Sequence, residues 1–305
     1  MKDKIAVVTG ATGYIGSKLC YRLIDDGWIV HVLCRDVGRN LTSILASKVT
    51  LHVYDGSTES VQNCIRSCRP EIVFHLASLC IVEHRSEQVT DLIASNVLYG
   101  VQLIEACVRN DIKYFINTGT SWQHYRSESF DPVCLYAATK QAFEDILDFY
   151  TDAYAIKALT LKLFDTYGPH DNRPKLVNLL INSAKSGELL KMTPGEQHLD
   201  LVHIDDVCNA FIHCSNLLTN GLILNSHERY VVSSSCSISV KQLVELVGEI
   251  SGKQINAVFG ARAYRAREVM RPYKGGKLPE GWFPEIDIRA GLAKLIFDSD
   301  IAPVD

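Results

Sequence analysis

KIAVVTGATGYIGS, residues 4–17, places an apolar run directly before three glycines and a helical pattern. The run is typical of a buried parallel strand, and Gly10, Gly13 and Gly16 follow it at a spacing of three. A side chain at these glycines would block the turn, the approach of a diphosphate, or the packing of helix on strand. The helix N-terminus then presents partial positive charge to phosphates. The stretch therefore predicts a dinucleotide-binding βαβ unit rather than a plain strand–helix turn.

Further strands and helices alternate along the first half of the chain. Apolar runs predict strands at 29–34, 49–54, 71–77 and 114–117, and helical periodicity predicts helices between them, the longest over 87–109. Such alternation is the pattern of a parallel sheet covered by helices on both faces. Inside the strand at 71–77, His75 is expected to be a core histidine.

Composition limits the classes of function that the chain can have. The chain has 305 residues, 47% of them hydrophobic, which suits one large α/β domain or two smaller units. A net charge of −4 without a basic run argues against a nucleic-acid surface. No apolar run approaches the length of a membrane span, and the N-terminus leaves no room for a signal peptide, so we expect a cytoplasmic protein.

The ten cysteines are scattered through apolar segments and form no CxxC motif. Cys64 and Cys68 share a helix face, where reduced thiols are the expected state rather than zinc ligands. The sequence therefore predicts no metal site.

The second predicted strand ends at the position where folds of this type bind the adenosine ribose of the cofactor. Cys34 occupies the strand tip, and Arg35 and Arg39 follow, which favours NADP because arginine accommodates a 2′-phosphate. Because Asp36 is acidic and follows the same strand, NAD remains a possible cofactor. Asp55, after the third strand, can accept from the adenine amine. The small Ala77 and Ser78 would let the cofactor pass over the fourth strand.

Two polar groups follow as candidates for catalysis. Thr118-Gly119-Thr120-Ser121 ends a strand at the edge where α/β sheets bind ligands, although a hydroxyl-rich turn is the alternative. Tyr136 and Lys140 are four residues apart and share a helix face. An ammonium beside a phenol stabilises phenolate, so we expect a lowered pKa for Tyr136.

The glycines, Thr120-Ser121, Tyr136 and Lys140 together resemble the extended short-chain dehydrogenase/reductase superfamily, in its nucleotide-sugar epimerase, dehydratase and reductase branch. Residues 161–169, 199–207 and 281–284 resemble later segments of that fold. NTGTSWQHY with LYAATKQAFE is most similar to bacterial nucleotide-activated 4-keto-6-deoxy sugar reductases of the CDP-paratose and CDP-abequose synthase kind, which serve deoxysugar and lipopolysaccharide synthesis.

This resemblance implies an α/β fold with a Rossmann-type doubly wound parallel sheet and a smaller C-terminal α/β substrate domain. The predicted boundaries are 1–165 for the NAD(P)-binding domain, with a returning segment near 199–235, and 166–305 mainly for the nucleotide sugar. Helices at 93–108 and 138–150 resemble those that pair as a four-helix bundle in family homodimers.

The resemblance also assigns roles to residues. Tyr136 is the proton donor, Lys140 holds the nicotinamide ribose, and Thr120, or Ser121 in exchange, binds the sugar oxygen. The predicted cofactor-binding residues, for NADP(H) with NAD(H) open, are Gly10, Gly13, Tyr14, Ile15, Gly16, Arg35, Asp55, Gly56, Leu76, Ala77, Tyr136 and Lys140. The predicted substrate-binding residues are Thr120, Ser121, Lys175, Asn178 and Arg267, with Arg173 and Arg271 as further candidates.

Departures from the family pattern reduce the number of reactions that this chain is expected to catalyse. The 4,6-dehydratases carry an Asp-Glu pair where this chain has residues 121–123, Ser-Trp-Gln, and no cysteine stands where enzymes that epimerise at two carbons need one. Reduction of a C4 ketone or C4 epimerisation remains, and Arg35 favours the NADPH-dependent reductase over an NAD-dependent epimerase. A non-catalytic NADP sensor is the third alternative; such proteins typically lack the tyrosine or lysine present here. Leu199 replaces the arginine that commonly precedes Asp200.

Overall fold

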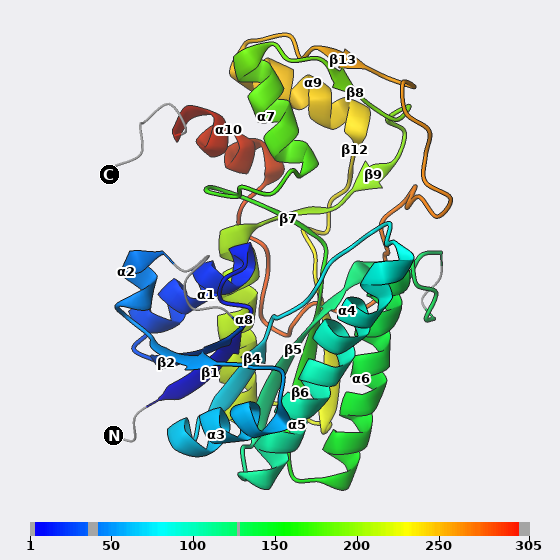
Figure 1. Cartoon of the computed structure of the whole chain (residues 1–305). Coiled ribbons are helices and arrows are strands. Elements are labelled where there is room, and N and C mark those ends of the chain that lie inside the picture. Colours follow the sequence, from blue (N-terminus) through cyan, green and yellow to red (C-terminus); the bar gives the residue numbers. More distant parts are fainter. Residues whose placement is uncertain (1–3, 36–41, 127–128, 299–305) are drawn as a thin grey trace.

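A seven-stranded parallel sheet forms the centre of the molecule (Figure 1). The computed structural model describes residues 4–35, 42–126 and 129–298. The strand order is β11-β6-β5-β4-β1-β2-β3, so the order reverses between β1 and β4, the point where doubly wound sheets bind ligands. The strands are β1 Ile5–Thr9, β2 Ile29–Cys34, β3 Thr50–Val53, β4 Ile72–His75, β5 Tyr114–Thr120, β6 Lys157–Leu163 and β11 His227–Val232. The predicted Rossmann-type fold is confirmed.

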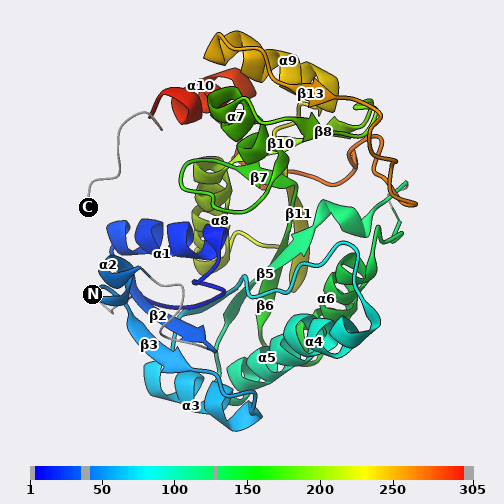
Figure 2. The same cartoon turned by 45° about the horizontal axis from the view of Figure 1, so that its top comes forward.

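Helices cover both faces of this sheet (Figures 1 and 2). On one face α1 (Tyr14–Asp25) packs on α8 (Ile204–Thr219), with the short α2 (Ser43–Ala46) beside them. The other face carries α3 (Thr58–Cys68), α5 (Tyr99–Arg109) and α6 (Leu135–Ala153). Strand β1 has apolar side chains towards both layers, since Ala6 and Val8 join one core and Val7 the other. Two-sided burial explains why the strands read as unbroken apolar runs.

The glycine turn after β1 has the tight geometry expected from its sequence. Gly10 has a φ of +76°, and a Cβ there would lie 2.6 Å from the backbone nitrogen of Ala77 after β4. A Cβ at Gly16 would lie 2.2 Å from the Gly10 carbonyl oxygen. Glycine is therefore required here for both the turn and the close packing of α1 on it.

A third, smaller core lies above the sheet in Figure 1. It is built by α7 (Leu176–Ser186), α9 (Val240–Ser251) and α10 (Ile288–Asp298). Three two-stranded ladders frame it: β7 (Asp165–Tyr167) with β10 (Leu201–His203), β9 (His198–Leu199) with β12 (Ile238–Ser239), and β8 (Leu190–Lys191) with β13 (Ala257–Val258). Between β10 and β12 the chain returns to the large layer, where β11 pairs with β6.

One helical stretch, residues 86–109, is long and apolar enough to cross a membrane by length and composition. This corrects the expectation that no segment approaches that length. It comprises a 3₁₀ turn at Ser86–Gln88, α4 (Val89–Ile93), a π turn at Ala94–Leu98, and α5. Half of its most apolar window is buried inside the protein, as in the core helix of a globular domain.

Candidate active site

A cleft of about 300 Å³ lies at the carboxyl ends of β1, β4 and β5. It brings together many residues that the sequence predicted, from segments far apart in the chain. Those that line it are Gly10, Gly13, Tyr14, Ile15, Gly16, Leu76, Thr120, Ser121, Tyr136, Lys140 and Lys175. His75, beneath the cleft, is fully buried and bonds Thr9 through Nδ1 at 2.8 Å, as expected of a core histidine.

Tyr136 stands in the first turn of α6 and points into the cleft's hydroxyl cluster. The side chains of Ser78 and Thr120 line the cleft with it. Burial raises the pKa of Tyr136 well above its usual value, and these two hydroxyl groups offset only part of that rise. The expectation of a lowered pKa is therefore wrong for this structure, because desolvation disfavours the phenolate. A protonated phenol is the form that donates a proton.

Lys140, one turn further along α6, is 1% exposed, and its Nζ has no hydrogen-bond partner among the described residues. Burial lowers the pKa of its ammonium to about 8, although Cys80 and Glu144 oppose this. A buried ammonium without a partner is costly, so its position points to a ligand with hydroxyl acceptors. A nicotinamide ribose diol fits this lysine, and the glycine turn fits the diphosphate.

The pKa of Lys140 predicts a pH dependence. The ammonium is present below pH 8 and lost above it, so we expect kcat/KM to fall about tenfold per pH unit above roughly pH 8. Lys140→Arg keeps its charge to higher pH and should lose this alkaline limb. An unchanged limb in Lys140→Arg, measured by steady-state rates from pH 6 to 10, would assign it to another group.

Thr120 is the last residue of β5, and both its backbone N–H and its hydroxyl oxygen are hydrogen-bonded. Its backbone N–H donates to Oε1 of Gln123 at 2.9 Å, and its Oγ1 accepts from the backbone N–H of Trp122 at 3.3 Å. Gln123 is fully buried, and its Nε2 donates to Gln141 at 2.6 Å and to Glu144 at 2.9 Å. This glutamine, which was not among the residues predicted from the sequence, links the end of β5 to α6.

Replacing Gln123 with leucine should misplace Thr120. The variant leaves the Thr120 N–H without its acceptor in a buried site, which costs about 1–3 kcal/mol, and we expect kcat to fall about tenfold or more because small displacements reduce rates strongly. Steady-state kinetics and urea unfolding measure the two effects. Gln254→Leu, at an exposed position, is the matched control. Normal kcat in Gln123→Leu would exclude the positioning role.

The residues predicted for the adenosine end lie outside the lining of the cleft. Arg35 is exposed at the end of β2. Asp55 accepts from the N–H and hydroxyl of Ser57, and these bonds lower its pKa to about 2. The Gly56 carbonyl accepts from Gln102, and the Ala77 N–H donates to Thr9. Asp36 and Arg39 lie outside the described residues. The adenine contact of Asp55 stays a prediction, since this carboxylate already serves the first turn of α3.

On the substrate side, Lys175 lies 3.6 Å from Asp165, and both line the cleft. Arg173 also lines it, bonded to Asp171 and stacked 4.7 Å over the Tyr14 ring. Asn178 does not line it; its amide donates to the backbone carbonyls of Asp171 and Arg173. Asn178 therefore stabilises the loop that carries Arg173.

The predicted anion-binding arginines near the C-terminus lie at different distances from this cleft. Arg267 forms an ion pair with Asp131 and stacks on Tyr125, outside the lining. Arg271 lines a separate hollow of about 510 Å³. Arg265, which the sequence reading did not consider, stacks 5.5 Å over the cleft residue Trp122. The spacing R-A-R alone could not decide which arginine faces the cleft.

A buried charge network supports α6 behind the cleft. Glu144, 1% exposed, lies 3.3 Å from Nζ of Lys162 in β6 and 2.6 Å from Nε of Arg229 in β11. Burial raises the pKa of Glu144, but these cations and Gln123 outweigh it, so the net pKa is lowered. The carboxylate thus holds three elements together.

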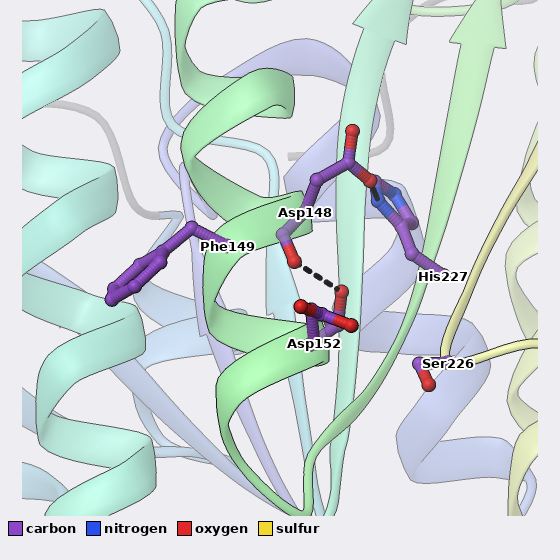
Figure 3. A pocket seen from close by; sticks show the side chains of 6 residues that line it. Asp148, Phe149, Asp152, Ser226 and His227 are labelled. Carbon is purple, nitrogen blue, oxygen red and sulfur yellow. Dashed lines mark hydrogen bonds and ion pairs between the residues drawn. The ribbon is translucent and has the colours of Figure 1, made fainter.

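This network ends at a second hollow of about 440 Å³, near the C-terminus of α6 (Figure 3). Figure 3 shows Asp148 beside His227, at 2.7 Å, and Phe149 pointing to the other side of α6. Arg229 bonds Asp148 at 2.5 Å and so joins the hollow to Glu144. Twelve residues of helix, about 18 Å, separate this hollow from Tyr136, so it is no part of the cleft.

Comparison with known proteins gives a consistent family. The model of the NAD dependent epimerase/dehydratase family matches residues 6–225. The CDP-abequose synthase of Yersinia pseudotuberculosis is 30% identical over 87% of this chain and 90% of its own length. The UDP-glucose 4-epimerase of Mycolicibacterium smegmatis is 26% identical over 95% of this chain and 96% of its own.

Solved structures agree in fold. MoeE5 in complex with UDP-glucose and NAD superposes with a TM-score of 0.82 at 23% identity, covering 98% of this chain and 99% of that one. At this identity the likeness concerns the fold.

Proposed function

The chain belongs to the NAD dependent epimerase/dehydratase family, and on that premise we propose that it is an NADPH-dependent reductase of a nucleotide-activated 4-keto-6-deoxy sugar. It is an NAD(P)-dependent enzyme of the extended short-chain dehydrogenase type. Relatives named as CDP-abequose synthases and as UDP-glucose 4-epimerases both support a nucleotide-sugar-modifying activity. We place the reaction in cytoplasmic deoxysugar synthesis for surface polysaccharide, with a CDP- or dTDP-linked substrate.

The observation that carries the proposal is the group formed by Tyr136, Thr120 and Lys140. The phenol and the threonine hydroxyl line the same cleft, and the ammonium, which also lines it, is buried without a hydrogen-bond partner among the described residues. A raised pKa keeps Tyr136 protonated, which suits net reduction, where an alkoxide must be protonated in every turnover.

The chain's own residues then have distinct tasks. A bound nicotinamide cofactor supplies the hydride. Tyr136 donates its proton to the C4 oxygen as negative charge develops there, and the Thr120 hydroxyl steadies that oxygen. Lys140 would orient the cofactor ribose through its free donors, and its positive charge would stabilise the phenolate that forms when Tyr136 gives up its proton, before solvent returns that proton. Lys175 and Arg265 are the proposed contacts for the diphosphate, and Arg35 for a 2′-phosphate.

Consumption of NADPH tests this function directly. The purified protein is mixed with CDP- or dTDP-4-keto-6-deoxyglucose, and absorbance is followed with NADPH and with NADH in parallel. We expect rapid oxidation of NADPH with one of the sugars. No oxidation with any pair would overturn the proposal.

The similarity to UDP-glucose 4-epimerases makes C4 epimerisation the second candidate. An epimerase must return the hydride, so it retains its cofactor through the cycle. NAD released on denaturing the purified protein, together with interconversion of UDP-glucose and UDP-galactose, would favour this reaction over the reductase.

We also propose a homodimer formed through the outer face of α4 and α6. Apolar side chains are exposed there, at Ile93 (43%), Leu98 (49%) and Phe149 (59%). Phe149→Glu should convert a dimer to a monomer because it places a charge in an apolar interface. Light scattering coupled to gel filtration measures the mass. The control is Phe283→Glu, at a side chain that is 70% exposed and lies on neither helix. A monomeric wild-type protein would contradict the proposal.

A further inference from the structure

Two histidines and a cysteine meet on the α3 side of the sheet, outside the reaction cleft. His31 lies in β2, His52 in the neighbouring β3, and Cys68 is the last residue of α3. Nδ1 of His31 is 2.9 Å from Nε2 of His52. The three residues can place one ring nitrogen each and the sulfur within 4.8 Å of one another. None of them lines the cleft.

The fold brings them together through two different periodicities. In the parallel register Leu33 stands opposite His52, and His31 shares the face of Leu33 because strand side chains alternate. This face packs on α3, whose buried stripe of Val61, Cys64, Ile65 and Cys68 recurs at helical spacing. The sequence places the three residues 21 and 16 positions apart, so no ligand motif is visible in it.

Their chemistry suits a metal ion of borderline softness. Both imidazoles are half-buried, and their rings stack at 5.2 Å between centroids. The Cys68 thiol donates to the backbone carbonyl of Cys64 at 3.0 Å, and metal binding would replace this hydrogen bond. In a tetrahedral zinc site two nitrogens lie about 3.3 Å apart, at Zn–N distances of about 2.0–2.1 Å. To become two ligands, the nitrogens must move apart by a few tenths of an ångström, both rings must turn so that their lone pairs face one ion, and the sulfur must approach from within 4.8 Å.

We propose that His31, His52 and Cys68 form a zinc site, in which solvent completes a tetrahedral coordination. Binding breaks the hydrogen bond between the imidazoles and releases the thiol proton of Cys68 to solvent, so that a thiolate and two neutral rings coordinate the ion. The ion would join β2, β3 and α3, and β2 ends at Cys34, one residue before Arg35. From the sequence alone Cys68 is expected to be a reduced thiol rather than a zinc ligand, and the proposed site departs from that expectation because His31 and His52 lie beside it.

Cobalt(II) is the probe for the site in the full-length protein after treatment with a chelator. We expect one equivalent to bind with a thiolate-to-cobalt charge-transfer band, and zinc(II) to displace it. Cys68→Ser should abolish the band, and His52→Gln should weaken binding by at least the 10- to 100-fold that loss of an outer partner costs. Cys236→Ser and His84→Gln, at exposed positions elsewhere, are matched controls that should bind normally.

Each outcome of the cobalt experiment either supports or overturns the zinc site. Absence of binding, a cobalt spectrum without the thiolate band, or a band that survives Cys68→Ser would overturn the site. If Cys68→Ser does not fold by circular dichroism, His52→Gln decides, because His52 is half-buried at an edge strand and unchanged affinity in that variant equally refutes the proposal.

Discussion

Tyr136→Phe should lower kcat by about 10²–10⁴-fold while KM changes little, because general acid catalysis contributes about that much. The change removes one hydroxyl and keeps the ring that lines the cleft. Burial keeps the phenol of the wild type protonated, so this hydroxyl carries the proton that the alkoxide would receive. Stopped-flow oxidation of NADPH with the 4-keto sugar measures the step.

Two controls make the result specific. Tyr154→Phe removes a hydroxyl at the exposed C-terminal end of the same helix and should leave turnover unchanged. Fluorescence titration with NADPH shows whether the Tyr136→Phe variant still binds its cofactor. Near-normal turnover in that variant would remove Tyr136 from the mechanism and leave the proton donor unassigned.

Glu144→Ala should destabilise the protein by about 3–5 kcal/mol, the cost of breaking a buried ion pair from one side. The Lys162 ammonium is 8% exposed and would lose its carboxylate partner in a desolvated layer. Gln123 and Arg229 would lose an acceptor at the same time. Urea unfolding monitored by circular dichroism gives the free energy of unfolding.

The control for this variant is an exposed pair. Glu249→Ala removes a carboxylate bonded to Arg289 at the surface, which is expected to cost about 0–1 kcal/mol. Because the pKa of Glu144 is lowered on folding, its contribution is present near neutral pH and is lost as pH falls through the acidic range. Equal midpoints for wild type and Glu144→Ala would show that the buried network adds no net stability.

Local spacing explains what could be predicted from the sequence. Gly10 and Gly16 are needed by a turn whose partners are close in the chain or in the adjacent strand, and Tyr136 and Lys140 share a helix face by period alone. The parallel sheet followed from unbroken apolar runs in strands that are buried on both sides. These features depend on few tertiary details.

Other features depended on contacts that spacing does not encode. Arg267 is held by Asp131, which lies 136 positions away in the sequence, so the local pattern could not show that Arg267 turns away from the cleft. The pKa of Tyr136 follows from burial, which outweighs the lowering effect of the Ser78 and Thr120 hydroxyls. Gln123 is a positioning residue only because Glu144 of α6 lies behind it.

The late return of the chain to the sheet has a consequence for synthesis in the cell. Strand β6, whose side chains are almost all buried, is an open edge until β11 pairs with it. The ribosome makes β11 roughly 70 residues later, a delay of roughly 3–14 s at 5–20 residues per second. During that interval the nascent chain exposes an apolar template for strand addition. The helices α7 and α8, which are made between β6 and β11, are the elements available to shield it.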